Sequence, residues 1–401
     1  MSAFRKKVYA CKGASSVYFG PGRKEFDPSK EMPSFEHYLK ESADQTLKSI
    51  NTAAIDEGII GSFMAAQFLH QGNLGGFLPS LVPSLKGKPC TAVEGACGTG
   101  GRAIAMAVRS ILSDLSDVVY VTGFEIQNCV KAVYGSDILA GAAYYRGERK
   151  EGDAFFFPGI FSKRAGAYFE KYGKDKARNA MAHWYAKAIE NARKHPKAQE
   201  FHNQTKDLLA LGKTEPVADK FLANLNPYDC SKVTDGASSI LITSEEGLKK
   251  LGVDKKDAIE ILSLGEAEGD ITKPPEEGAY FAQTSKAAKE ALKNASLTVN
   301  DLGCLEIHDC FTISALLALE AIGVAPKGGA PDWITTKRDE LPVNSSGGLI
   351  GFGHPTGASG VRMLVDLHEQ LTGKAPLKHP YGMLVSMGGN DITVTAVVVK
   401  K

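Results

Sequence analysis

Cys97 lies in a glycine-rich run between a short apolar stretch and a predicted helix, Glu94-Gly95-Ala96-Cys97-Gly98-Thr99-Gly100-Gly101. A cysteine at a helix start meets free N–H groups and the positive end of the helix dipole, which favour the thiolate. The thiolate attacks thioester carbonyls, and the backbone N–H of Cys97 can stabilise the resulting oxyanion. We therefore predict that Cys97 is a nucleophile. The alternative is a buried, inert cysteine, which is the usual role of an isolated one.

His354 belongs to a second such run, Gly351-Phe352-Gly353-His354-Pro355-Thr356-Gly357-Ala358-Ser359-Gly360. The residue before a proline adopts an extended conformation, and Pro355 suits the first turn of a helix. The ring of His354 is therefore expected to point out of a loop at a helix start. There it can take the proton of Cys97 or donate to an oxyanion. The alternative is a histidine that only caps the helix.

A third group of reactive side chains, His308-Asp309-Cys310, follows a predicted strand. We predict that His308 hydrogen-bonds a thioester oxygen and that Cys310 exchanges a proton with a substrate carbon. Asp309 is expected to fix a ring or a loop. The alternative is a polar strand end with one buried cysteine. Adjacent residues at a strand end project in different directions, so we expect no metal site here.

A fourth segment, Ser386-Met387-Gly388-Gly389, separates two apolar strands near the C-terminus. A glycine allows a substrate to approach the backbone closely, so the Gly388 N–H is predicted to bind an oxyanion. The alternative is a plain hairpin turn.

The elements that must position these residues alternate between strands and helices. Fully apolar strands of this kind favour a parallel sheet covered by helices, and hence the α/β class. The order strand, reactive turn, helix occurs around Cys97 and again around His308–Cys310, which predicts an internal duplication. The expected strands are Pro89–Val93, Val118–Val121, Ser239–Thr243, Ile259–Ser263 and Cys304–Ile307, and the expected helices are Thr99–Leu112, Asp175–Lys194, Gln283–Asn294 and Ser314–Ile322.

Composition excludes some classes of function. The 401 residues carry a formal net charge of +1, which gives no support for binding nucleic acid or a membrane surface. The 7 cysteines are odd in number, show no CxxC spacing and follow no secretory leader, so we expect free thiols in the cytoplasm. No apolar stretch is long enough to cross a membrane.

Taken together, the blocks resemble the thiolase family over about residues 50–401. The matching segments are Ala96–Gly101, Gly123-Phe124-Glu125, Asp235-Gly236-Ala237-Ser238 and Val343–Gly348 with Gly353–Gly360. The resemblance implies duplicated βαβαβαββ halves that form a five-layered α-β-α-β-α core. The implied domains are an N-terminal half (1–127 plus 226–257), an inserted loop domain over the active site (128–225) and a C-terminal half (258–401).

His308-Asp309-Cys310-Phe311 is similar to the His-Asp-Cys-Phe block of sterol-carrier-protein-2-type thiolases. Other thiolases have a second cysteine in a C-terminal Cys-x-Gly, where Ser386 is expected here, and Cys310 is thought to replace it. The chain departs from the family at Glu94, at the unusual run Phe155–Phe157 and near Lys12, where an N-terminal Gly-x-Gly motif is missing.

The resemblance implies an acyltransferase of lipid metabolism that cleaves a 3-oxoacyl-CoA with CoA, or runs the reverse Claisen condensation, through an acyl group on Cys97. The implied catalytic residues are Cys97, His308, Cys310 and His354, and the implied oxyanion donors are Cys97, Gly388, His308 and His354. Coenzyme A is expected as a co-substrate, with no permanent cofactor and no residues assigned to its binding. The expected partners are a second copy of the chain and a small zinc-ribbon, OB-fold subunit, the latter with a specialised or aromatic substrate. Two alternatives remain: a ketoacyl-synthase or HMG-CoA-synthase relative, and a non-catalytic acyl-CoA-binding protein.

Overall fold

The computed structural model describes residues 4–149, 155–373 and 375–401, and its strands form one mixed sheet of 9 strands in the order β3-β2-β4-β5-β1-β6-β9-β8-β7. The pairs β2–β3, β2–β4 and β7–β8 are parallel, and the remaining pairs are antiparallel. The sheet is therefore mixed and not purely parallel, because the last strand of each half runs antiparallel to the strand before it. The strands are β1 (Val8–Ser15), β2 (Glu57–Gly61), β3 (Cys90–Val93), β4 (Val118–Glu125), β5 (Gly236–Ser244), β6 (Ala258–Glu268), β7 (Leu302–Ile307), β8 (Tyr381–Gly388) and β9 (Thr393–Lys400).

The sheet contains the predicted duplication. The run β2-β4-β5-β1 and the run β7-β8-β9-β6 have the same order and the same pattern of parallel and antiparallel pairs. In the first half, β3 pairs with β2 in parallel. In the second half, the corresponding position beside β7 is taken by Val343, which forms a parallel bridge with Leu305. The turn after β3 therefore corresponds to the segment after Val343, which leads to His354. The predicted match of the Cys97 turn to His308–Cys310 is wrong, since β7 corresponds to β2 and not to β3.

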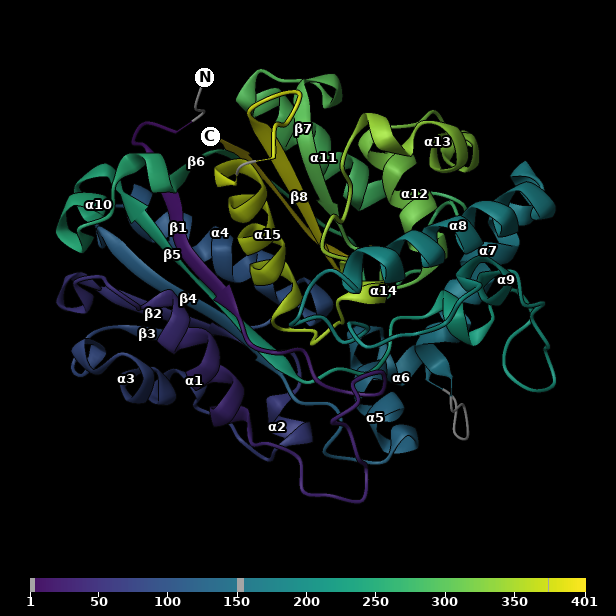
Figure 1. Ribbon diagram of the computed structural model, residues 1–401, viewed down its shortest axis with the longest axis horizontal. Helices are drawn as coiled ribbons and strands as arrows, with labels where there is room; N and C mark the ends of the chain where they lie inside the picture. The colour runs from purple at the N-terminus through teal and green to yellow at the C-terminus, as the bar shows by residue number, and fades with distance from the viewer. Residues whose placement is uncertain (1–3, 150–154, 374) are drawn as a thin grey trace.

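Five layers follow from the helix packing (Figure 1). α4 (Thr99–Leu112) and α15 (Ser359–Thr372) lie between the two halves of the sheet and share one apolar core with both. α1 (Phe35–Thr46) covers the outer face of the first half, and α11 (Ala282–Ala295) covers that of the second. The other α-helices are α2 (Ala65–Phe68), α3 (Leu78–Leu81), α5 (Ala132–Leu139), α6 (Tyr145–Glu148), α7 (Phe156–Tyr172), α8 (Lys174–Ala192), α9 (Leu208–Gly212), α10 (Glu245–Leu251), α12 (Thr312–Ile322), α13 (Ala330–Thr336) and α14 (Gly348–Gly351).

The seam between α4 and α15 is made of glycine backbone. A Cβ atom added to Gly100 would lie 2.6 Å from the backbone nitrogen of Val361, and one added to Gly360 would lie 2.4 Å from that of Gly101. Both distances are far inside van der Waals contact, so only glycine fits at these two positions. The first turns of the two helices therefore touch through their main chains.

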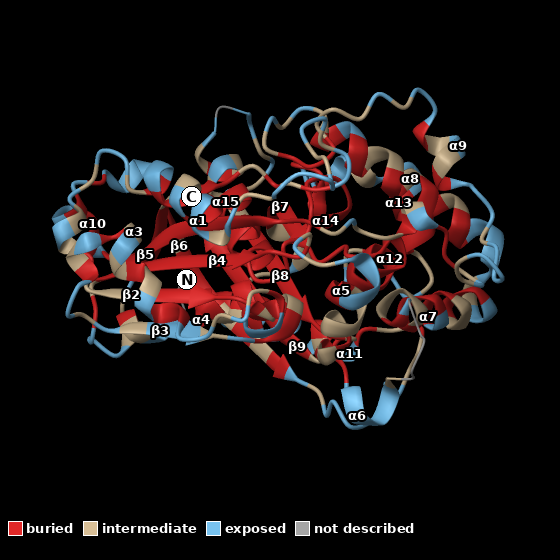
Figure 2. Cartoon of the chain, turned by 90° about the horizontal axis from the view of Figure 1, so that it is seen from below, coloured by how far each residue is buried: buried red, intermediate tan, exposed pale blue. Residues whose placement is uncertain are grey.

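The segment between β4 and β5 packs into the core of the C-terminal half. Phe161 and Tyr168 of α7 and Trp184 of α8 are buried in the same core as the residues of α12 (Figure 2). The inserted helices are thus continuous with the packing of the C-terminal half. Residues 150–154 of the predicted insertion lie outside the described residues.

β3 forms one edge of the sheet. Thr91 and Ala92 are exposed, so the predicted burial of this strand is wrong.

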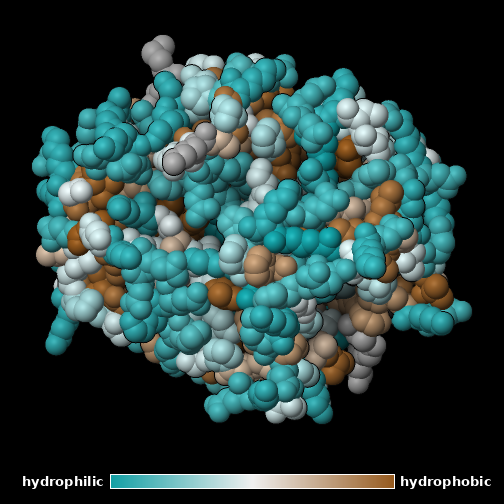
Figure 3. Space-filling model, viewed as in Figure 1, coloured by the Kyte–Doolittle hydropathy of each residue, from teal (hydrophilic) through white to brown (hydrophobic). Residues whose placement is uncertain are grey.

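The face in Figure 3 is mainly hydrophilic, with small scattered apolar areas. Among the described helices, none is both long and apolar enough to cross a bilayer.

Candidate active site

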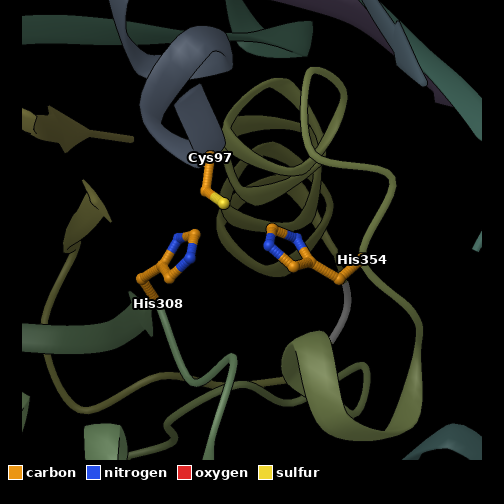
Figure 4. A group of neighbouring side chains, drawn as sticks. All are labelled: Cys97, His308 and His354. Atoms are coloured by element: carbon orange, nitrogen blue, oxygen red, sulfur yellow. The ribbon is translucent and has the colours of Figure 1, made fainter. Parts of the chain in front are cut away.

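The four predicted catalytic side chains meet at one cavity of about 360 Å³. Cys97 lies in a single 3-10 turn, Ala96–Gly98, directly before α4, whereas His308 and Cys310 follow β7. His354 comes from the loop before α15. The sulfur of Cys97, one ring nitrogen of His308 and one ring nitrogen of His354 lie within 4.8 Å of one another. Figure 4 shows the sulfur directed between the two imidazole rings.

The hydrogen bonds of His354 determine which ring nitrogen carries its proton. Ser359 Oγ donates its only proton to the carbonyl oxygen of Pro355 at 2.9 Å. It must therefore accept the bond at 2.7 Å from Nδ1 of His354. Nε2 keeps a free lone pair, and it has no hydrogen-bond partner among the described residues. Burial, with the neighbouring His308 and Arg362, holds the pKa of His354 well below its usual value, so the ring is a neutral proton acceptor.

His308 has the opposite tautomer. Its Nδ1 accepts the backbone N–H of Met387 at 3.4 Å, so the proton of the neutral ring lies on Nε2. This N–H is likewise unpartnered among the residues that the structure describes. Burial and the charge of Arg362 lower the pKa of His308 to about 3. The site therefore contains one imidazole that accepts a proton and one that donates a hydrogen bond.

The two thiols are protonated in the free protein. Burial, with Glu125, raises the pKa of Cys97 to about 12, although the N–H groups of Gly389 and of Cys97 itself point at the sulfur and act in the opposite direction. The prediction that the helix start alone favours the thiolate is thus wrong, because desolvation outweighs the dipole. Burial and the nearby Cys97 also raise the pKa of Cys310, whose sulfur lies 3.7 Å from Ser314 Oγ. Cys97 therefore needs a base, and His354 Nε2 is in position to serve as one.

The C-terminal turn brings Gly389, the residue after the predicted Gly388, to the cavity at Cys97. Gly388 and Gly389 both line a second cavity beside the nucleophile turn. The Oγ of Ser386 is buried without a partner among the described residues and lies against the glycines of α4 and α15. Ser386 does not line the cavity that holds Cys97, whereas Cys310 does.

Glu125, at the end of β4, ties the nearby loops together, a role that the sequence did not reveal. Its buried carboxylate accepts from Ser62 Oγ at 2.9 Å, Phe63 N at 2.8 Å and Met64 N at 3.2 Å. It also accepts from Thr356 Oγ1 at 2.8 Å and from Gly357 N at 3.2 Å. The end of β2 and the loop of His354 are therefore held on one side chain.

Asp309 fixes a loop, as predicted, and does not face the cavity. Its carboxylate accepts from Trp184 Nε1 at 2.9 Å and from Leu349 N at 2.7 Å. Burial raises its pKa to about 6. Asp309 thus fastens the turn of His308 and Cys310 to α8 and to the start of α14.

Cys97, His308 and His354 are also the donor types that a zinc ion prefers. Zinc would need a lone pair on Nε2 of both rings, but the Met387 N–H places a proton on Nε2 of His308. The arrangement therefore suits proton transfer better than metal binding, and Asp309 belongs to the loop contacts instead.

Comparison with known proteins agrees with this geometry. Residues 272–400 match the family model described as Thiolase C-terminal domain-like. The chain is 30% identical over 380 residues to the acetyl-CoA acetyltransferase of Methanocaldococcus jannaschii, covering 90% of this chain and 93% of that protein. It is 29% identical over 335 residues to human sterol carrier protein 2, covering 79% of this chain and 58% of the relative.

Among solved structures, the chain is similar to the Ltp2-ChsH2(DUF35) aldolase, with a TM-score of 0.74 and 15% identity over 98% of this chain and 97% of that one. At this identity the likeness supports the fold alone. The family model, the archaeal relative and the shared fold lead to one conclusion: this chain belongs to the thiolase family of acyltransferases.

Proposed function

We propose that the protein catalyses CoA-dependent cleavage of a 3-oxoacyl-CoA and the reverse Claisen condensation, with the acyl group carried on Cys97. The observation that carries the proposal is the convergence of the Cys97 sulfur and the rings of two oppositely protonated histidines beside the second thiol, Cys310. The archaeal acetyl-CoA acetyltransferase supports the same class of substrate.

In the first half-reaction, the sulfur of Cys97 attacks the 3-oxo carbon while His354 Nε2 takes its proton. The N–H groups of Cys97 and Gly389, which already point at the sulfur, hold the oxyanion. The bond between C2 and C3 then breaks. The departing enolate oxygen accepts from Nε2 of His308 and of the protonated His354, and Cys310 gives its proton to C2.

In the second half-reaction, a new CoA thiol gives its proton to the Cys310 thiolate and attacks the acyl group. The sulfur of Cys97 leaves and recovers its proton from His354. Both thiols and both imidazoles return to their starting protonation states, so the cycle balances.

The test is the loss of the enolate absorbance of acetoacetyl-CoA on addition of CoA, together with transfer of a radioactive acetyl group to the protein. We expect turnover and one labelled cysteine in the wild type, and neither in Cys97→Ala. Full turnover in Cys97→Ala would reject the assignment. A wild-type protein that binds acyl-CoA but takes up no label would favour the non-catalytic alternative.

We also propose that two copies of the chain pair through the exposed edge of β3, together with the neighbouring segment 72–85. An exposed strand edge offers unpaired backbone groups to a second strand. Ala92→Lys should lower the molar mass measured by light scattering from that of a dimer to that of a monomer. A dimeric mass in Ala92→Lys would place the contact elsewhere.

A small zinc-ribbon, OB-fold subunit is a further proposed partner, since the similar aldolase structure is described with a DUF35 component. The proposed location is the cytoplasm, because all 7 cysteines are free.

A further inference from the structure

We infer that the acyl group transferred by Cys97 is bulky and carries no charge, an inference that rests on the proposed function. Five phenylalanines are among the residues that line the cavity that holds the nucleophile. They are Phe63, Phe68, Phe155, Phe157 and Phe311. Val130, Leu139 and Pro158 extend the same apolar surface.

Charge is nearly missing from this wall. Of the described residues that line the cavity, only Lys232 carries a full charge when the histidines and thiols are neutral. Lys232 is exposed, and its ammonium group is paired with the carboxylate of Glu200. A carboxylate on the acyl group would lose its water without gaining a partner, which is a large cost in an apolar site.

The end of the cavity beside the nucleophile is shaped by large apolar side chains and by two alanines. Phe63, Ala96 and Ala142 form a buried cluster against which Leu139 and Phe157 pack, and Ala96 directly precedes Cys97. Ala142 backs onto Gly389, where an added Cβ would lie 2.7 Å from the carbonyl oxygen of Ala142. Ala142 and Gly389 therefore pack closely beside the sulfur, and a larger side chain at Gly389 would not fit.

The opposite end opens to solvent. Pro21, Ala132, Phe155 and Lys232 are lining residues that are themselves exposed, so they mark the mouth. CoA enters there with its hydrophilic end outside. The cavity of about 360 Å³ takes both the arm of CoA and the acyl group, and its part near Leu139 and Ala142 is then left to the acyl group.

The first test compares 3-oxoadipyl-CoA with its methyl ester, two thioesters that differ in one negative charge and little in length. We expect the ester to have a kcat/KM for thiolysis about 100-fold above that of the acid. We also expect 3-oxo-3-phenylpropionyl-CoA to be cleaved at least as efficiently as acetoacetyl-CoA. Equal rates for acid and ester, or a clear preference for acetoacetyl-CoA, would overturn the inference and leave the proposed function standing. No turnover with any of the four would overturn both.

The second test moves a cation into the wall. Leu139 is half-buried at the end of α5. Leu139→Lys should lower the ratio of kcat/KM for the ester to kcat/KM for the acid by at least about tenfold. Val133→Lys is the matched control, because Val133 is exposed on the same helix and does not line the cavity. An unchanged ratio in folded Leu139→Lys, or the same change in both variants, would show that the acyl group lies elsewhere. The comparison of acid and ester in the wild type does not depend on either variant.

Discussion

The hydroxyl oxygen of Ser359 lies 2.7 Å from Nδ1 of His354, and the hydroxyl donates a hydrogen bond to the carbonyl oxygen of Pro355. Ser359 is thereby an obligatory acceptor, and His354 must present an unprotonated Nε2 to the cavity. Ser359, the first residue of α15, thus keeps Nε2 of His354 unprotonated, so that His354 can act as a base.

Replacing Ser359 should weaken catalysis without disturbing the fold. In Ser359→Ala the ring of His354 can rotate or change tautomer, and we expect kcat to fall between about 10- and 100-fold. The rate at which iodoacetamide alkylates Cys97 should fall as well, since the same base assists both reactions. Ser359→Thr keeps the hydroxyl and should recover most of the rate. Ser359→Ala with wild-type kcat would show that the bond does not orient the base.

The reactivity of Cys97 should keep rising with pH. Its pKa is raised to about 12, so only a small fraction is thiolate at neutral pH, and that fraction grows tenfold per pH unit below the pKa. Alkylation of the free enzyme should therefore accelerate from about pH 7 to about pH 10 without levelling off. A plateau near pH 8 would mean a pKa close to that of an ordinary thiol.

Loss of Cys310 should separate the two half-reactions. In Cys310→Ala the carbon acid has no proton donor, so exchange of the α-protons of acetyl-CoA into deuterated water should slow by at least roughly 100-fold. Acetylation of Cys97 by acetyl-CoA should be slowed much less, because the attack uses His354 as the base and CoA can leave as a thiolate without the proton of Cys310. Cys129→Ala is the control, since Cys129 is exposed and does not line the cavity. Unchanged exchange in Cys310→Ala would move the role to another group.

Removing the indole N–H of Trp184 should destabilise the protein. Trp184→Phe leaves the buried carboxylate of Asp309 with one donor fewer, at a cost of about 1–3 kcal/mol. We expect thermal unfolding to begin a few degrees lower and activity to fall, because the turn of His308 and Cys310 loses an anchor. Trp333→Phe is the matched control, as no hydrogen bond of its Nε1 is found among the described residues. Equal effects of the two changes would point to ring packing instead.

Sequence reasoning identified the four side chains that meet at the cavity and missed most of the residues that hold them in place. Cys97, His308, Cys310 and His354 were identifiable because glycines, a proline or a strand end surround each of them. The family resemblance then brought them together. Ser359 and Glu125 lie within the segments that resemble the family, but their positioning roles were not identified, because hydrogen bonds to residues up to 232 positions away leave no local pattern.

The fold was predictable where periodicity is strong. The helices α4, α11 and α12 begin and end within a few residues of their expected bounds. The exposure of β3 was not predictable, since its composition is that of a central strand and only the sheet order makes it an edge. The pKa of Cys97 was also misjudged, because the helix dipole can be inferred from sequence whereas the depth of burial cannot.

The glycine seam between α4 and α15 fixes the distance between these two helices. Because their main chains are in direct contact there, the distance does not depend on how side chains pack. The nucleophile precedes one of these helices and the base precedes the other, so their spacing should persist through substitutions elsewhere that reshape the acyl pocket. A protein built in this way can change what it binds while the reacting atoms stay in place.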